Sequence, residues 1–105
     1  MSKTLKQNAS FLRFLQCASH QQQKLLLQSV THDQAKALLE IVFNLMHREF
    51  PLTAVQRDKL RRYKTTLRRL VNTKTSTKQK IKLLKKSRNA VLLVLTAVTP
   101  IIKTL

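Results

Sequence analysis

Glycine is absent from this chain of 105 residues, and proline occurs only at Pro51 and Pro100. The tight turns of β-hairpins depend on residues that tolerate positive φ, above all glycine, so an all-β fold has few residues with which to make its turns. The hydrophobic content of 43% also separates the chain from disordered basic tails, which have too few apolar groups to fold. The sequence therefore predicts an all-α fold, a small bundle of about five helices followed by an apolar C-terminal helical segment.

Four capping-box signatures, in which Ser or Thr is followed three positions later by Gln, mark predicted helix starts. These pairs are Ser19/Gln22, Thr31/Gln34, Thr53/Gln56 and Ser76/Gln79. Together with the apolar spacing, they predict helices near residues 10–18, 20–29, 32–48, 54–71 and 77–87, and an apolar helical segment at 90–102.

The domain organisation follows from the lack of a linker and from the length. No Gly/Ser-rich segment divides the chain, so we interpret Pro51 as a break between helices of one unit. A length of 105 residues also favours one domain. We therefore predict a single helical domain with an apolar scaffold at 1–50, basic helices at 51–89 and an apolar tail at 90–105.

The third predicted helix has the strongest apolar periodicity and is the expected core helix. Its apolar positions recur at steps of three and four, with Ile41 and Phe43 widening the surface: Ala35, Leu38, Leu39, Val42, Leu45 and Met46. The N-terminal residues expected to pack against it are Phe11, Leu12, Phe14, Leu15, Leu25, Leu26, Leu27 and Val30. The first half of the chain is therefore predicted to be a compact helical hairpin or three-helix unit.

The chain is strongly basic, with 21 Lys and Arg against four Asp and Glu and a formal net charge of +17. Residues 1–50 hold six basic and three acidic side chains, whereas residues 51–105 hold fifteen basic and one acidic. A charge of this size exceeds what solubility requires and opposes a compact state through self-repulsion. We therefore expect a polyanionic partner that binds the C-terminal half.

The fourth predicted helix separates apolar and basic residues onto two faces. The apolar stripe consists of Leu60, Tyr63, Leu67, Leu70 and Val71. The basic stripe consists of Arg57, Arg61, Lys64 and Arg68, flanked by Arg62 and Arg69. A solvated charged face is the alternative interpretation, but such faces usually pair Glu with Lys at four-residue spacing, and Asp58 is the only acid between residues 57 and 88.

These observations favour binding to the phosphate backbone of a nucleic acid over binding to an anionic membrane surface or an acidic protein. The predicted nucleic-acid-binding residues are Arg57, Arg61, Arg62, Lys64, Arg68, Arg69, Lys74, Lys78, Lys80, Lys82, Lys85, Lys86 and Arg88. The sequence has neither zinc-finger spacing nor an aromatic-rich RNA-binding strand motif, so we expect binding that tolerates any base sequence. Tyr63 could stack on a base, but its place on the apolar stripe favours a packing role.

The apolar segment at 90–102 is uncharged and about thirteen residues long, which is short of the roughly 20 that a membrane-spanning helix needs. We expect it to pack internally or to form a homo-oligomer contact. Internal packing would place Leu92, Leu93 and Leu95 against the face formed by Leu38, Leu39 and Val42. An interfacial membrane role, with the preceding lysines at lipid headgroups, is the alternative.

Catalytic and metal-binding patterns are weak, so we expect a protein that is not an enzyme and needs no cofactor. The three histidines and Cys17 have no recognised metal-ligand spacing, although Cys17 and His20 are one helical turn apart. A single cysteine cannot form an intramolecular disulfide, which fits a reducing compartment. Residues 1–10 are polar and include Lys3 and Lys6, so no secretory signal peptide is expected.

From residue 31 onward the order of parts resembles a known family. An apolar helix reading ALLEIVFNLM at 37–46 is followed by FPLT at 50–53, LRRYKTTLRRL at 60–70, a Lys-rich helix and an apolar tail. This order resembles the small basic proteins of Maverick/Polinton-type elements and adintoviruses, which are in turn compared with the adenovirus core protein X (mu) precursor. The resemblance implies a virion core protein that condenses double-stranded DNA, located in the virion core or the host nucleus.

By this resemblance, the basic positions from Arg57 to Arg88 would be the DNA-condensing surface, and the apolar tail would match the family's hydrophobic C-terminus. Relatives often carry a Gly-Gly-Phe step before the tail that suggests a maturation cleavage site. Here the residues at that place are Ser87, Arg88, Asn89 and Ala90. The resemblance therefore gives no basis for predicting cleavage at this position.

Overall fold

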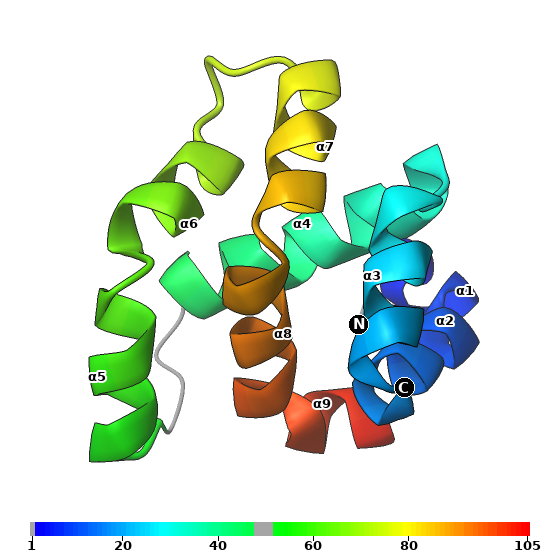
Figure 1. Cartoon of the computed structure of the whole chain (residues 1–105), viewed down its shortest axis with the longest axis horizontal. Coiled ribbons are helices and arrows are strands. Elements are labelled where there is room, and N and C mark those ends of the chain that lie inside the picture. Colours follow the sequence, from blue (N-terminus) through cyan, green and yellow to red (C-terminus); the bar gives the residue numbers. More distant parts are fainter. Residues whose placement is uncertain (1, 48–51) are drawn as a thin grey trace.

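The structure is a computed structural model that describes residues 2–47 and 52–105. Within these residues the chain forms nine α-helices and no strand, so the predicted all-α class is confirmed (Figure 1). The helices are α1 (Lys3–Gln7), α2 (Ala9–Cys17), α3 (His20–Gln28), α4 (His32–His47), α5 (Ala54–Arg61), α6 (Lys64–Val71), α7 (Thr77–Lys86), α8 (Arg88–Ala97) and α9 (Thr99–Lys103).

The predicted number of about five helices plus a tail was too low. Helix α1 was not predicted, and it is capped by Ser2, whose side chain accepts a hydrogen bond from the N–H of Leu5 at 3.1 Å. The tail was predicted as one segment but is two helices that meet at Val98. Pro100 lies in the first turn of α9, where the missing N–H of proline is tolerated. The break that we predicted at Pro51 lies outside the described residues.

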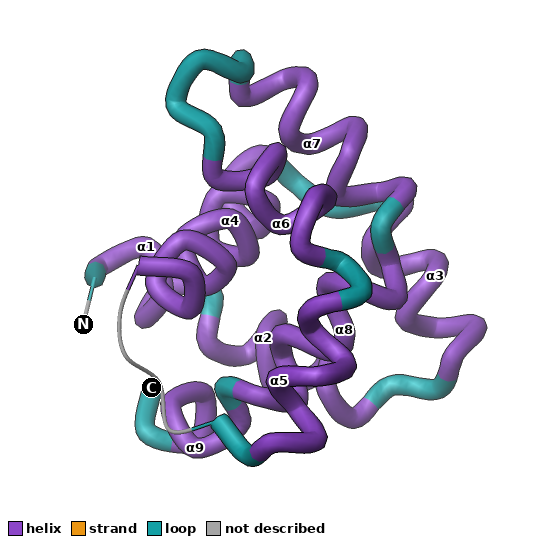
Figure 2. The backbone as a smooth tube through the Cα atoms, turned by 90° about the vertical axis from the view of Figure 1, so that its left-hand side faces the viewer, coloured by secondary structure: helices purple, strands orange, loops and turns teal. Residues whose placement is uncertain are grey.

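The largest difference concerns the helix predicted at 54–71, which is divided into α5 and α6 at Arg62 and Tyr63. At this point the N–H of Tyr63 donates to the carbonyl of Leu60 at 2.9 Å, a tighter turn than that of an α-helix. The division lets the two segments contact different partners, because α5 packs against α8 whereas α6 packs against α4. The short loop between them is visible from two directions in Figures 1 and 2.

The predicted capping boxes form at three of the four helix starts. The Ser19/Gln22, Thr31/Gln34 and Thr53/Gln56 pairs each exchange both hydrogen bonds. At the fourth, the Ser76 hydroxyl accepts from the N–H of Gln79 at 3.2 Å, and no return bond from the glutamine side chain is present. Local chemistry therefore determines where α3, α4, α5 and α7 begin.

Replacing Thr31 with alanine is expected to lower the free energy of unfolding by about 1 kcal/mol, because α4 loses the side chain that caps its first turn. The Thr31 hydroxyl accepts from the N–H of Gln34 at 3.1 Å. Urea denaturation followed by circular dichroism measures the effect. The matched control is Thr65→Ala on the exposed surface of α6, which removes no cap and should leave stability unchanged or slightly raised. Equal losses in both variants would contradict the capping role.

One hydrophobic core joins the nine described helices, since each contributes at least one buried residue to the same cluster. Helix α4 lies at its centre and contacts α1, α6, α7 and α8. The Cα radius of gyration is 12.7 Å, close to the roughly 13 Å expected for a compact chain of this length. The basic helices and the apolar scaffold therefore share one core.

Most of the predicted core residues of α4 are buried, but three of the apolar residues expected in the core, one of them in α4, are exposed. Phe43 is 44% exposed, and its ring lies 4.2 Å from that of His47, centroid to centroid. Phe14 of α2 and Leu25 of α3 are also exposed, at 56% and 67%.

The apolar tail packs internally, although only one of the three leucines that were predicted to be buried is fully so. Leu95 is buried and Leu92 and Leu93 are half-buried, in helix α8, which contacts α4. The Gln16 side-chain amide donates to the carbonyl of Leu95 at 2.8 Å and to the hydroxyl of Thr99 at 3.1 Å, which ties the tail to α2. No helix among residues 2–47 and 52–105 combines the length and the apolar character needed to cross a bilayer.

Candidate nucleic-acid interface

The predicted binding residues are distributed over four helices and the segments between them. Helix α5 carries Arg57 and Arg61, and the following turn carries Arg62; α6 carries Lys64, Arg68 and Arg69; the next loop carries Lys74; α7 carries Lys78, Lys80, Lys82, Lys85 and Lys86; and α8 begins with Arg88. None is buried, and all are exposed except for Lys80, Lys85 and Arg88, which are half-buried. All thirteen side chains can therefore reach a ligand in solution.

Buried leucines determine which way the basic side chains of α5 and α6 point. Leu60, Leu67 and Leu70 have only 8%, 2% and 1% of their surface exposed. Because these leucines face the core, the arginines between them on the other sides of the helices must face solvent. Tyr63 and Val71 of the predicted apolar stripe are half-buried and pack against the core.

The basic stripe predicted along a single helix is not continuous in the structure. The break at Arg62 and Tyr63 separates the arginines of α5 from the basic residues of α6. Helix α6 instead lies against α7, so the cations of α6 and those of α7 belong to neighbouring helices. We call the thirteen predicted residues, as arranged on α5, α6, α7 and the start of α8, the basic surface.

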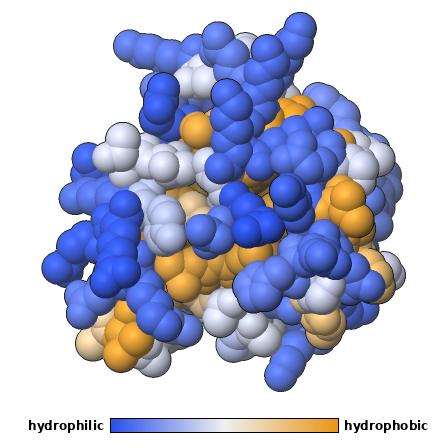
Figure 3. Space-filling model, in the orientation of Figure 1, coloured by the Kyte–Doolittle hydropathy of each residue, from blue (hydrophilic) through white to orange (hydrophobic). Residues whose placement is uncertain are grey.

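The loop between α6 and α7 is held by a local hydrogen bond. The side-chain oxygen of Asn72 accepts from the N–H of Lys74 at 3.0 Å, the arrangement of an Asx turn. In Figure 3, hydrophilic residues cover the upper part of the visible face, where α6, this loop and α7 lie. Apolar residues show mainly in the middle of the same face.

The positive charge of the basic surface is almost uncompensated within the described residues. The one ion pair there joins Arg61 to Asp58 at 3.8 Å, with both side chains about three-quarters exposed. A pair so exposed contributes little to stability. Glu40 of α4 instead accepts a hydrogen bond from the Ser2 hydroxyl at 2.8 Å. The cations of α6 and α7 thus form no ion pair with a described carboxylate and attract external anions.

The structure adds one cation that the sequence analysis did not assign. Lys24 of α3 lines the same pocket as Lys85, Lys86 and Arg88. Nothing in the sequence indicates this neighbourhood, because Lys24 is an isolated lysine in a segment with little charge. Only the packing of α3 against α7 and α8 brings these residues together.

The described residues contain no group of three or more His, Cys, Asp or Glu side chains placed to hold a metal ion. Cys17 is exposed and forms no disulfide, and it lines a separate pocket together with His20. Comparisons with protein-family models, with curated proteins and with solved structures found no match to this chain.

Proposed function

We propose that this protein binds nucleic acid through the phosphate backbone, without preference for base sequence, and that its natural ligand is double-stranded DNA. The main support is the basic surface, whose cations point outward from buried leucines and, on α6 and α7, form no ion pair with a described carboxylate. Lys and Arg that contact phosphates release condensed counterions, which favours binding regardless of base sequence. Such contacts are positional rather than catalytic, so we propose a packaging role and not an enzymatic one.

The resemblance to the core-type proteins of Maverick/Polinton elements and adintoviruses extends this proposal to condensation of DNA in a virion core. The molecule is small and nearly equal in its three dimensions, with principal extents of 32, 31 and 29 Å. A body of this size with a large net positive charge can neutralise phosphates of neighbouring DNA segments and lower their mutual repulsion.

Binding to duplex DNA is expected to weaken steeply with salt. If seven of the fourteen basic residues between 57 and 88 meet phosphates, log Kd should change with log salt concentration by a slope of roughly 6. Fluorescence anisotropy with several duplexes of unrelated sequence, each at a series of salt concentrations, measures both the slope and the sequence dependence. Similar affinities for all duplexes are expected. A sharp preference for one sequence, or a flat salt response, would remove this function.

Binding to an anionic membrane remains the alternative from a different class. The lysines of the protein could contact lipid headgroups. For α8 to enter the membrane, however, its apolar residues would first have to leave the core. Burial of Val91, Val94 and Leu95 opposes that step. We therefore favour nucleic acid as the partner.

A further inference from the structure

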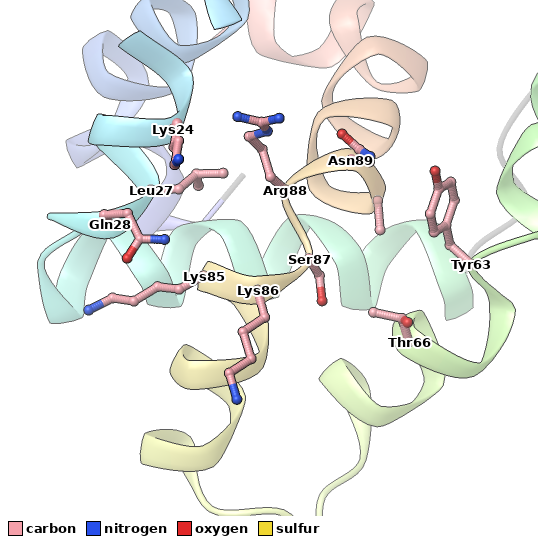
Figure 4. Close-up of a pocket in the computed structure, with 11 residues that line it drawn as sticks. Lys24, Leu27, Gln28, Tyr63, Thr66, Lys85, Lys86, Ser87, Arg88 and Asn89 are labelled. Atoms are coloured by element: carbon pink, nitrogen blue, oxygen red, sulfur yellow. The ribbon is translucent and has the colours of Figure 1, made fainter. Parts of the chain in front are cut away.

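A pocket of about 400 Å³ lies where α3, α6, α7 and the start of α8 meet. This volume is within the roughly 300–1,000 Å³ typical of small-ligand sites. Lys24 and Gln28 come from α3, Lys85 and Lys86 from the last turn of α7, and Arg88 from the first residue of α8. In Figure 4, Arg88 extends into the space between α3 and α8, with Lys24 on the α3 side of that space.

The lining of this pocket is cationic and includes no carboxylate. Arg88 is half-buried, and its guanidinium forms neither a hydrogen bond nor an ion pair with any residue in 2–47 or 52–105. The ammonium groups of Lys24 and Lys85 likewise lack a partner among those residues. No side-chain nitrogen of the described residues is both buried and without a hydrogen-bond partner, so the five N–H donors of this guanidinium are open to solvent and free to bind an acceptor. The pocket is therefore suited to an anion.

Other groups around the pocket are also donors. Tyr63 and Ser87, which carry hydroxyl groups, are among the residues that line it. Ser87 is the N-cap of α8, and its side chain accepts no hydrogen bond from the first turn, which leaves the N–H groups of Asn89 and Ala90 without a side-chain cap. These N–H groups add to the attraction that the four cations of the lining, Lys24, Lys85, Lys86 and Arg88, exert on an anion.

We propose that this pocket binds one phosphate group, with Lys24 and Arg88 as its principal ligands. The planar guanidinium of Arg88 can bind two phosphate oxygens at once, and the ammonium of Lys24 supplies a second positive charge from another helix. The expected source is the backbone of a nucleic acid, and in this respect the inference rests on the proposed function. It adds that α3, which carries none of the thirteen predicted residues, takes part in the binding surface.

The first experiment uses inorganic phosphate and the full chain. Nuclear magnetic resonance of the 12.2 kDa protein, with phosphate replacing chloride at constant ionic strength, should show saturable shifts at the amides of Arg88, Asn89 and Ala90. Lys24→Gln should abolish the saturation, whereas Lys36→Gln should retain it. Lys36 is an exposed lysine of α4 that does not line this pocket, so it controls for the loss of one charge.

The second experiment measures duplex DNA affinity in the same variants. Lys24→Gln should weaken binding roughly tenfold, as expected for the loss of a charge-assisted hydrogen bond. It should also lower the salt slope by about 0.9. Lys24→Arg, which keeps the charge, should retain most of the affinity. Lys36→Gln should keep the wild-type slope. Circular dichroism of each variant verifies that the helices are intact.

The outcomes separate this inference from the proposed function. One outcome is a steep salt dependence of DNA binding with Lys24→Gln and Lys36→Gln behaving alike in both experiments. It would overturn the proposal that the pocket binds phosphate and leave the proposed function standing. A second outcome is that phosphate causes saturable shifts, that Lys24→Gln abolishes them, and that the protein does not bind duplex DNA. It would support the pocket with a small phosphate compound as its ligand, and it would overturn the proposed function. Failure of both experiments would overturn both.

Discussion

Replacing Leu95 with aspartate is expected to unfold the protein. Leu95 is 2% exposed and lies in the core cluster that joins the described helices. An aspartate at this position would place a carboxylate among apolar side chains with no partner, at a cost of several kcal/mol. Domains of this size are stable by only about 5–15 kcal/mol, so the loss removes most or all of the folded population. Circular dichroism should show low helicity and no cooperative thermal transition.

The matched control for this change is Thr96→Asp, which introduces the same charge at the next residue. Thr96 is exposed, so its carboxylate remains in water and the fold should persist. A milder variant, Leu95→Ala, should fold with a free energy of unfolding lower by about 2–5 kcal/mol, because it removes apolar contacts without burying a charge.

The same variants test the membrane alternative. The wild-type protein and Leu95→Asp are compared for release of dye from anionic liposomes. If the wild-type protein released dye and Leu95→Asp did not, while Leu95→Asp kept its helicity, the tail would not act mainly by packing in the core. The membrane alternative would then gain support. Loss of helicity in Leu95→Asp alone, with Thr96→Asp folded, would place the tail in the core in solution.

The parts of the fold that the sequence predicted well are those determined by neighbouring residues. Capping boxes depend on residues three positions apart, and the pairs at Ser19, Thr31 and Thr53 form as expected. The break at Tyr63 was missed because no proline, glycine or capping residue marks it, and only the different partners of α5 and α6 account for it. The break before α9 was also missed, although Pro100 fits the first turn of a helix and opposes a long one.

In the candidate site, too, features set by neighbouring residues were predicted and features set by packing between distant segments were not. The outward direction of the arginines follows from the spacing of leucines such as Leu67 and Leu70, and the sequence predicts it. Their grouping does not follow, because the break at Tyr63 turns α6 onto α7. The neighbourhood of Lys24 and Arg88 depends on packing between helices distant in sequence, for which periodicity carries no information.

Changing Arg61, Arg62, Arg68 and Arg69 together to glutamine is expected to reduce duplex DNA affinity to a small fraction of its wild-type value. If each arginine neutralises one phosphate, the salt slope should fall by roughly 3.6, since each contact contributes about 0.9. All four side chains are exposed, and glutamine is a good helix former, so helical content should stay nearly unchanged. The loss should be equal for duplexes of unrelated sequence, because phosphate contacts carry no base information.

A second quartet with the same loss of charge makes this result specific to the basic surface. Lys3, Lys6, Lys36 and Lys103 are exposed and lie outside that surface, so their replacement by glutamine controls for net charge. Equal weakening by the two quartets would mean that affinity follows total charge and that the arrangement of α5 and α6 is irrelevant. An unchanged affinity and slope in the arginine quartet would move the phosphate contacts to α7, between Lys78 and Lys86. Only a loss confined to the arginine quartet agrees with binding through the outward faces of α5 and α6.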